Sequence, residues 1–145
     1  DDYQAEVITN AKAFARALTE SGVAVEGDPS VDYTETHQVI LNVGRSQGSE
    51  MARRLEGNNI ITNYQALPRD ASFSDASGIR LGVQEMTRFG MKEGDFEELS
   101  GFMSDIILKN KELGDAVSKF RERFTTMQYC LPADENLISA ALGVD

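Results

Sequence analysis

Apolar residues recur along this chain with two different periods, one typical of helices and one typical of strands. Near the start they lie three and four positions apart, at Tyr3, Val7, Ala11, Phe14 and Leu18. This spacing places them on one face of an α-helix. Ser21 and Gly22 follow, and glycine is the residue that most often ends a helix. The pattern therefore predicts a helix over residues 3–18.

Four short segments have the composition or the alternation of β-strands: residues 23–25, 37–43, 60–64 and 78–83. The clearest is the second, HQVILNV, in which every other residue is Val or Leu. Between the second and third strands, Met51 and Leu55 lie four residues apart and Gly57 follows. This arrangement predicts a short helix between the two strands.

Two amphipathic stripes follow the last strand. One contains Phe96, Leu99, Met103 and Ile106, and the other contains Leu113, Val117, Phe120, Phe124 and Met127. Both have helical spacing, and Gly114 predicts a bend or break between the two helices. Pro132 precedes a candidate last helical turn. The predicted order is helix, strand, strand, helix, strand, strand, helix, helix.

This order predicts one domain over residues 1–145 with an α/β (α+β) two-layer sandwich fold. In this fold a small, mostly antiparallel sheet carries the helices on one face. A chain of 145 residues can bury an adequate core as one domain. Its first residues, DDYQAEVITN, enter a helical pattern without an initiator Met, so we expect the chain to be cut from something longer.

Composition and charge exclude several classes of function. The 14 basic and 24 acidic residues give a net charge of −10, which excludes a broad basic surface for nucleic acid. No apolar run is long enough to cross a bilayer, and no signal peptide is visible, so we predict a cytoplasmic location without membrane binding. One His and one Cys leave no zinc-type ligand set, and the single Cys130 excludes an internal disulfide framework.

Few residues form a catalytic pattern. The sequence has neither a glycine-rich phosphate loop nor a nucleophile elbow. His37 is the one side chain that titrates near neutral pH without help, and we interpret it as a strand-edge residue that caps a loop. Cys130 fits a small buried hydrophobe. We assign no catalytic residue and no metal ligand.

A cation inside a strand is the most informative feature of the chain. Arg80 lies between Ile79 and Leu81, and Ser77 and Gly78 precede it after a polar, irregular segment. Its planar guanidinium suits a carboxylate or a phosphate, and loops that border strands often carry binding residues. Strand alternation also permits a solvated or ion-paired arginine. The pattern alone leaves both interpretations open.

The segments around this arginine resemble one enzyme family. NIITNYQALPRD, then SGIRLG, then TRFGM are similar to the C-terminal domain of serine hydroxymethyltransferase, a pyridoxal-phosphate enzyme of glycine and serine metabolism. The likeness extends over nearly the whole chain, and VQEMTRFGM and FRERFTTMQYC look most like the archaeal-type branch. The resemblance implies the small-domain fold of fold-type I pyridoxal-phosphate enzymes. It also implies that Arg80 binds the α-carboxylate of the amino-acid substrate.

The same resemblance implies a site for a one-carbon carrier. Asn63 matches the first Asn of the family stretch, and Gln65 stands where the family has the Asn that contacts the pterin. The carrier would be a tetrahydropterin, either tetrahydrofolate or tetrahydromethanopterin. Tyr64 replaces a Lys, and residues 83–85 replace Thr-Pro-Ala. These departures leave the carboxylate site intact and leave open whether the usual carrier, a different pterin or no pterin binds.

In the family, a lysine of the large domain binds pyridoxal phosphate, whereas this chain resembles the small domain alone. None of its lysines matches a Schiff-base motif. We therefore predict that the isolated chain neither holds the cofactor tightly nor turns over substrate. The implied partners are an amino-acid substrate, the chain's own large domain and, in the full-length enzyme, a second copy in a homodimer.

Two other interpretations remain open. One is a pterin-independent threonine aldolase or transaldolase of the same fold, which the departures at Tyr64 and Gln65 favour. The other is a non-catalytic interaction domain, in which the acidic surface and the stripe from Leu113 to Met127 bind a partner helix. Ordinary core packing explains that stripe as well.

Overall fold

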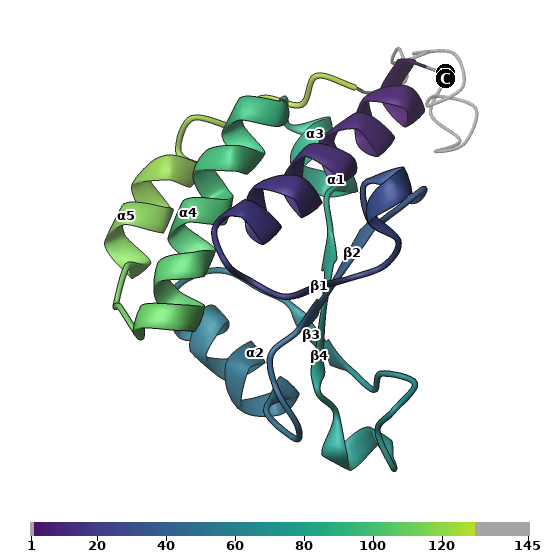
Figure 1. The fold of residues 1–145 in the computed structure, drawn as a ribbon. Helices are drawn as coiled ribbons and strands as arrows, with labels where there is room; N and C mark the ends of the chain where they lie inside the picture. Colours follow the sequence, from purple (N-terminus) through teal and green to yellow (C-terminus); the bar gives the residue numbers. More distant parts are fainter. Residues whose placement is uncertain (1, 130–145) are drawn as a thin grey trace, which may run out of the picture.

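The computed structural model describes residues 2–129, which form helices on one side of a small sheet (Figure 1). The α-helices are α1 (Asp2–Glu20), α2 (Gly48–Gly57), α3 (Gln84–Arg88), α4 (Glu93–Lys109) and α5 (Gly114–Arg121). The strands are β1 (Val25–Glu26), β2 (Gln38–Asn42), β3 (Asn63–Gln65) and β4 (Gly78–Gly82), and two 3₁₀ turns are η1 (Pro29–Val31) and η2 (Phe73–Asp75).

The four strands pair in the order β1-β2-β4-β3, and every pair is antiparallel. Arg80 of β4 lies opposite Ile40 of β2 on one side and opposite Asn63 of β3 on the other. Residues directly opposite each other point to the same face of a sheet. The predicted two-layer fold with a small antiparallel sheet is therefore confirmed.

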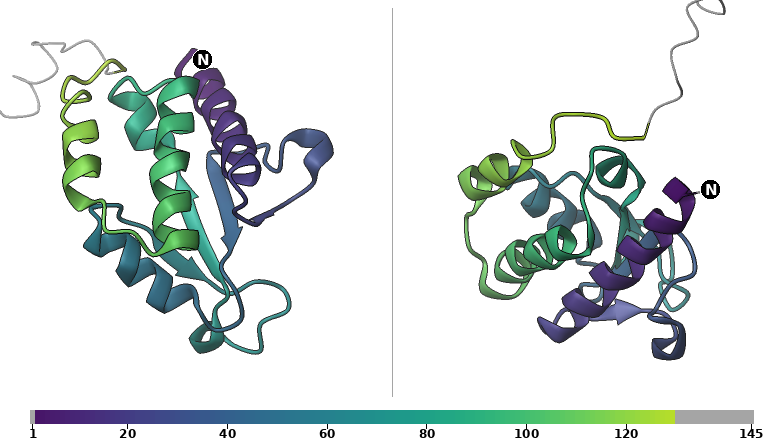
Figure 2. Two further views of the ribbon diagram at one scale, coloured as in Figure 1. Left: turned by 60° about the vertical axis from the view of Figure 1, so that its left-hand side comes forward. Right: turned by 90° about the horizontal axis from the view of Figure 1, so that it is seen from above.

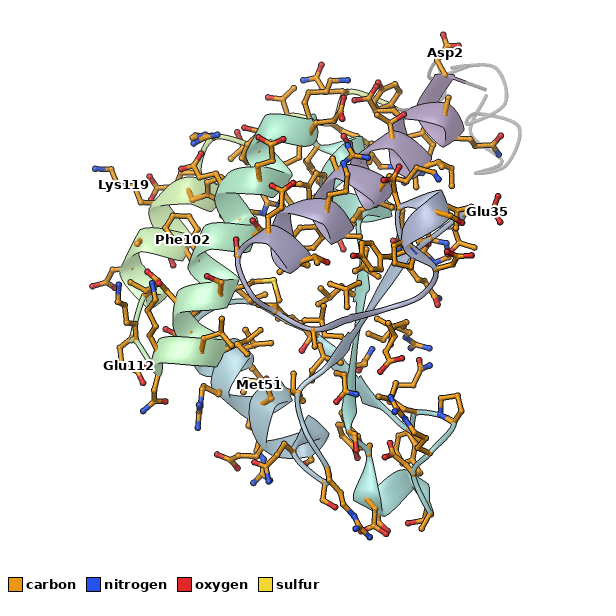
Figure 3. All side chains as sticks on the ribbon, in the orientation of Figure 1. Asp2, Glu35, Met51, Phe102, Glu112 and Lys119 are labelled. Atoms are coloured by element: carbon orange, nitrogen blue, oxygen red, sulfur yellow. The ribbon has the colours of Figure 1, made fainter. Side chains whose placement is uncertain are left out.

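The core lies between the sheet and the helices α1 and α4, which pack side by side over one face (Figures 1 and 2). Alternate residues of β2 and β4 point into this core. They are Val39, Leu41, Ile79 and Leu81, and all four are buried. From the helices, Phe14 and Phe96 meet with ring centroids 5.3 Å apart. Side chains fill the layer between the helices and the sheet (Figure 3). This alternation of core-facing and open-face residues explains why the sequence pattern predicts strands at β2 and β4.

The first helix ends as its sequence predicts. Gly22 adopts a left-handed backbone angle, φ +91°, which glycine takes without steric cost. The amide of Val23 donates to the carbonyl of Leu18 at 3.0 Å, and the amide of Gly22 donates to Thr19 at 2.9 Å. These two bonds form the Schellman motif, which satisfies the last free carbonyls of a helix.

The observed elements differ from the predicted ones in several places. The first strand covers Val25–Glu26 rather than residues 23–25, the third covers Asn63–Gln65 rather than residues 60–64, and α3 was not predicted at all. The last amphipathic stripe does not continue as one helix, because α5 ends at Arg121, whose guanidinium donates to the carbonyl of Phe124. Met127 is 44% exposed and does not belong to that stripe.

The chain turns back after α5 because it pairs with α3. The amide of Gln128 donates to the carbonyl of Arg88 at 2.8 Å, and the ring of Tyr129 lies 5.2 Å from that of Tyr3. Such contacts join segments far apart in sequence, so local periodicity does not reveal them. The candidate turn after Pro132 and the assignment of Cys130 fall outside the described residues. No helix within residues 2–129 is long and apolar enough to span a membrane.

Candidate functional site

Arg80 stands on the face of the sheet that the helices leave open. Gly78 and Gly82 lie two residues to either side of it on β4, so they point to the same face and place no side chain there. Arg80 is exposed, and its guanidinium makes no ion pair or hydrogen bond with any residue in the range 2–129. Gly82 is exposed and Gly78 is buried, so bare backbone adjoins Arg80 on the Gly82 side.

Close packing explains why position 78 is a glycine. A Cβ on Gly78 would lie 2.7 Å from the carbonyl oxygen of Gln65 and 2.8 Å from a methyl group of Leu67. A Cβ on Gly82 would meet only the end of the Gln84 side chain, at 2.5 Å. The first contact involves backbone and does not yield, whereas the second involves a flexible amide that can move.

Two hollows adjoin Arg80, and both include Asn63. The larger, about 420 Å³, is lined by His37, Gln38, Ile61, Thr62, Asn63, Arg80, Leu81, Gly82, Gln84 and Glu85. The smaller, about 340 Å³, is lined by Asn63, Tyr64, Gln65, Phe73 and Arg80. The structure therefore brings together the three residues that the sequence proposed as binding residues, Arg80, Asn63 and Gln65.

Four other lining residues were not predicted to belong to this site. His37 was interpreted only as a strand-edge residue, yet it faces the same hollow as Arg80, and its carbonyl accepts the amide of Val83 at 3.1 Å. Gln84 and Glu85 reach the hollow because α3 begins directly after β4. Phe73 carried one signal in the sequence: it is the one aromatic residue in the polar stretch ASFSDAS.

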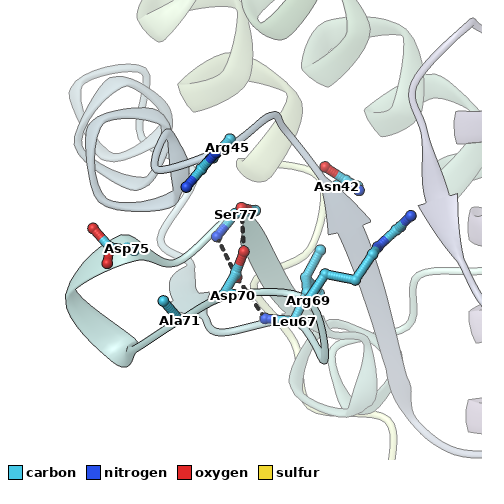
Figure 4. A pocket seen from close by; sticks show the side chains of 8 residues that line it. All are labelled: Asn42, Arg45, Leu67, Arg69, Asp70, Ala71, Asp75 and Ser77. Carbon is cyan, nitrogen blue, oxygen red and sulfur yellow. Dashed lines mark hydrogen bonds between the residues drawn. The ribbon is translucent and has the colours of Figure 1, made fainter.

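The loop between β3 and β4 is held in place by one carboxylate. Asp70 accepts hydrogen bonds from the amide of Leu67 at 2.7 Å, the amide of Ser77 at 2.8 Å and the hydroxyl of Ser77 at 2.5 Å (Figure 4). The Ser77 hydroxyl bond, the Leu67 amide and the Ser77 amide all favour the ionised form, so the pKa of Asp70 lies below its ordinary value. The carboxylate fixes both ends of the loop that carries Phe73.

A third pocket, of about 350 Å³, lies beside this loop (Figure 4). Its lining comprises Asn42, Arg45, Leu67, Arg69, Asp70, Ala71, Asp75 and Ser77. A nitrogen of Arg69 lies 3.4 Å from a carboxylate oxygen of Glu26, and both side chains are partly or largely exposed. This pocket mixes both signs of charge and shares no residue with the hollows at Arg80.

The arrangement at Arg80 suits a small carboxylate ligand. A guanidinium offers two parallel N–H donors to one carboxylate, and the amides of Asn63 and Gln65 offer donors and acceptors next to it. No lysine in the described part of the chain lines either hollow. Within residues 2–129 no three His, Cys, Asp or Glu side chains gather in a way that could hold a metal ion.

The described lysines are engaged elsewhere or lie on the helical side. Lys12 donates to the carbonyl of Val31 at 2.6 Å, and Lys92 pairs with Glu6 at 3.0 Å. Lys109 and Lys111 both pair with Asp105, at 2.7 and 2.8 Å. None of these lysines lines the hollows at Arg80.

Comparisons with known proteins place this geometry in context. A family model described as serine hydroxymethyltransferase matches residues 1–103. The serine hydroxymethyltransferase of Pyrobaculum aerophilum is 43% identical over 141 residues, which are 94% of this chain and 32% of that protein. The serine hydroxymethyltransferase of Metallosphaera sedula is 41% identical over 140 residues, which are 92% of this chain and 32% of that protein.

A solved structure has the same arrangement of elements. The crystal structure of L-threonine transaldolase from Pseudomonas fluorescens superposes with a TM-score of 0.83 at 35% sequence identity. The match covers 98% of this chain and 33% of that chain. The present chain thus spans about a third of the length of the relatives that it matches.

Proposed function

This chain belongs to the serine hydroxymethyltransferase family, and we propose that it is the C-terminal small domain of a longer enzyme that interconverts serine and glycine. Residues 1–145 form that one domain, and a large cofactor-binding domain precedes it. The length of the match, about a third of each relative, supports this division. The full-length enzyme is a cytoplasmic homodimer in this proposal.

One observation carries the proposal: the guanidinium of Arg80 is exposed on the open face of the sheet and pairs with no residue in the range 2–129. Its role is to bind the α-carboxylate of serine or glycine. A bidentate pair fixes the substrate in two directions, so the bond to be broken is held at a set angle to the cofactor. The exposed backbone at Gly82 leaves room on that side of Arg80 for the substrate and for the large domain to approach.

The family implies pyridoxal phosphate as cofactor, but the described lysines of this chain do not fit its attachment. When bound, that cofactor supplies an electron sink for charge at the substrate's α-carbon. The residues that hold it belong to the large domain in this proposal. We therefore expect the isolated chain to be inactive and to leave pyridoxal phosphate unbound, as judged by its visible absorbance after gel filtration.

Asn63 and Gln65 are the residues that we assign to the tetrahydropterin co-substrate, tetrahydrofolate or tetrahydromethanopterin. Both line the hollow next to Arg80 and carry amides that can pair with the polar edge of a pterin. Gln65 is one carbon longer than the Asn found in the family. The supporting observation is that the two amides and Arg80 share one hollow, as transfer between two bound substrates requires.

A second candidate function is a pterin-independent threonine aldolase or transaldolase. The likeness to the L-threonine transaldolase of Pseudomonas fluorescens favours it, since 35% identity over 98% of this chain is comparable with the identity to several serine hydroxymethyltransferases. Both candidates use Arg80 in the same way. They differ in the second substrate, which is a tetrahydropterin in one and an aldehyde in the other.

The experiment that tests the role of Arg80 uses the full-length protein that carries this chain. Arg80→Ala should weaken glycine binding by about 100-fold or more, because the carboxylate loses its charged partner. Arg80→Lys should weaken it by about tenfold, because the charge remains and the planar fork is lost. Arg53→Ala, at an exposed arginine of α2, is the matched control. Unchanged glycine affinity in Arg80→Ala would favour the non-catalytic interaction domain instead.

Cleavage of serine by the full-length protein separates the two candidate functions. A hydroxymethyltransferase should release glycine from serine much faster when tetrahydrofolate or tetrahydromethanopterin is added. A transaldolase should be indifferent to both carriers and should exchange the side chain of threonine with an added aldehyde. The amino-acid affinity measured for Arg80→Ala decides the role of this residue in either case.

A further inference from the structure

The short helix α3 forms one wall of the hollow at Arg80, and its position depends on contacts with other elements. Gln84 and Glu85, in its first turn, line the 420 Å³ hollow. A helix of five residues is unstable by itself, because ordering the first turn costs more conformational entropy than its few hydrogen bonds offset. Contacts with α1, which lies beside α3, therefore hold this wall in place (Figure 1).

One buried asparagine of α1 makes the central contact with α3. Asn10 is fully buried. Its Nδ2 donates to Oγ1 of Thr87 at 3.0 Å and to the carbonyl of Met91 at 2.9 Å. The hydroxyl of Thr87 in turn donates to the carbonyl of Val83 at 2.8 Å. Asn10 thus connects α1 both to the residue before α3 and to the turn that follows α3.

The residues at the start of α3 join this contact to the wall of the hollow. The amide of Val83 donates to the carbonyl of His37 at 3.1 Å. The phenol of Tyr3, also on α1, donates to the carbonyl of Gln84 at 2.8 Å. Both His37 and Gln84 line the hollow. A displacement of α3 from α1 therefore changes the shape of the hollow beside Arg80.

Stability alone does not explain the amide at Asn10. Its Oδ1 is buried and accepts no hydrogen bond from any residue in the range 2–129. A buried polar atom without a partner lowers the stability of a protein, and an apolar side chain would not carry this cost. The side chain is better explained by its two N–H donors, which reach both ends of α3.

We propose that Asn10 is a positioning residue of the Arg80 site: it holds α3 against α1, and α3 forms one wall of the hollow. This inference rests on the proposed function, because it takes that hollow as the place where the amino acid binds. Asn10 itself lines neither hollow at Arg80, so it affects a bound amino acid only through α3.

A second buried asparagine provides a matched control. Asn58 joins α2 to the start of α5: its Nδ2 donates to the carbonyl of Arg54 at 3.0 Å, and its Oδ1 accepts the amide of Leu113 at 2.5 Å. It lines neither hollow at Arg80. Asn58→Ala and Asn10→Ala should both destabilise the domain, because each removes two buried hydrogen bonds, but only Asn10→Ala should displace α3.

The test measures glycine binding to both variants of the full-length protein by titration calorimetry, at a temperature at which both are folded. Asn10→Ala should weaken glycine binding by about tenfold, because the wall of the hollow moves. Asn58→Ala should change it by less than about twofold, because its site is remote from the hollow. Hydrogen exchange of the amides of residues 84–88 should be faster in Asn10→Ala and unchanged in Asn58→Ala.

Variants of Thr87 separate positioning from a loss of packing. Thr87→Val keeps the shape of the side chain but removes the hydroxyl, so it should weaken glycine binding by about fivefold. Thr87→Ser keeps the hydroxyl and should bind glycine within about twofold of the wild type. Thr87→Val added to Asn10→Ala should lower the affinity by less than about twofold more, because both residues act through one contact.

Three results would overturn the inference: unchanged glycine affinity in Asn10→Ala, an equal loss of affinity in Asn58→Ala, or unchanged hydrogen exchange in α3. Failure of the proposed function gives a different result. In that case the wild type binds no glycine, or Arg80→Ala binds it as the wild type does, and the inference falls with the function. Glycine binding that depends on Arg80 but not on Asn10 supports the function and rejects the inference alone.

Discussion

The two faces of the sheet come from the same strands and follow different rules. On the face covered by α1 and α4, β2 and β4 contribute only Val, Leu and Ile, and every one of these side chains is buried. On the open face, β4 contributes one arginine between two glycines. The covered face stabilises the domain through core packing. The open face contributes little to that packing and is available for ligands. Neighbouring residues of one strand therefore have different roles, one in core packing and the other on the face available for ligands.

Ile79 and Arg80 give the sharpest test of this difference, because they are adjacent in β4 and point to opposite faces. Ile79 is fully buried, so Ile79→Ala should lower the free energy of unfolding by about 2–5 kcal/mol through lost burial and a cavity. Arg80→Ala should change that free energy by no more than about 0.5 kcal/mol, because the side chain is exposed and pairs with none of residues 2–129. Urea denaturation of the 145-residue chain measures both.

A matched pair on β2 repeats the comparison. Leu41→Ala should behave like Ile79→Ala, since Leu41 is fully buried and lies opposite Ile79. Gln38→Ala, on the open face, should behave like Arg80→Ala. A large loss of stability in Arg80→Ala would show that the open face contributes to folding, and the division between the two faces would be wrong.

The covered face was predictable from the sequence because burial repeats with the period of the backbone. The stripe from Tyr3 to Leu18 became α1, and the alternation of Val39 and Leu41 became β2. Helix ends followed from local chemistry, as at Gly22. The order of elements then sufficed for the two-layer fold, although the short α3 was missed. Five residues are too few to show a helical period.

The open face was less predictable, because its residues meet through contacts distant in sequence. Asn63 and Arg80 lie 17 positions apart, and nothing in their spacing indicates that they line the same hollows. The pattern around Arg80 is compatible with both a solvated arginine and a ligand-binding arginine. The family resemblance, and not the alternation, assigned it to a carboxylate. The structure adds that Asn63, Gln65 and Arg80 share one hollow.

The two glycines that flank Arg80 should respond differently to alanine. Gly78→Ala should lower the free energy of unfolding by about 1–3 kcal/mol, because the new Cβ meets the backbone of Gln65 and the side chain of Leu67. Gly82→Ala should cost about 0.5 kcal/mol or less, because only the end of the Gln84 side chain must move. Equal losses for both variants would mean that Gly82, like Gly78, is required for packing rather than for access to Arg80.

Asp70 tests the link between the loop and the open face, and its effect on stability is the smallest. Its pKa is lowered in the folded chain, so its contribution is complete above the ordinary aspartate pKa of about 3.9 and is lost as the pH falls through the lower folded value. Asp70→Asn should therefore melt slightly below the wild type at pH 7, and the gap should narrow below about pH 4. Thermal melts between pH 7 and pH 3 measure this gap.

Asp28 provides the control, since hydrogen bonds from Ser30 lower its pKa in the same direction at a site away from the open face. Asp28→Asn should show the same pH-dependent gap in melting temperature. The two variants should differ in binding, because only Asp70 orders the loop that carries Phe73. Asp70→Asn in the full-length protein should weaken binding of tetrahydrofolate or tetrahydromethanopterin and spare glycine binding, whereas Asp28→Asn should spare both. Equal binding in the two variants would show that the open face does not depend on its loop.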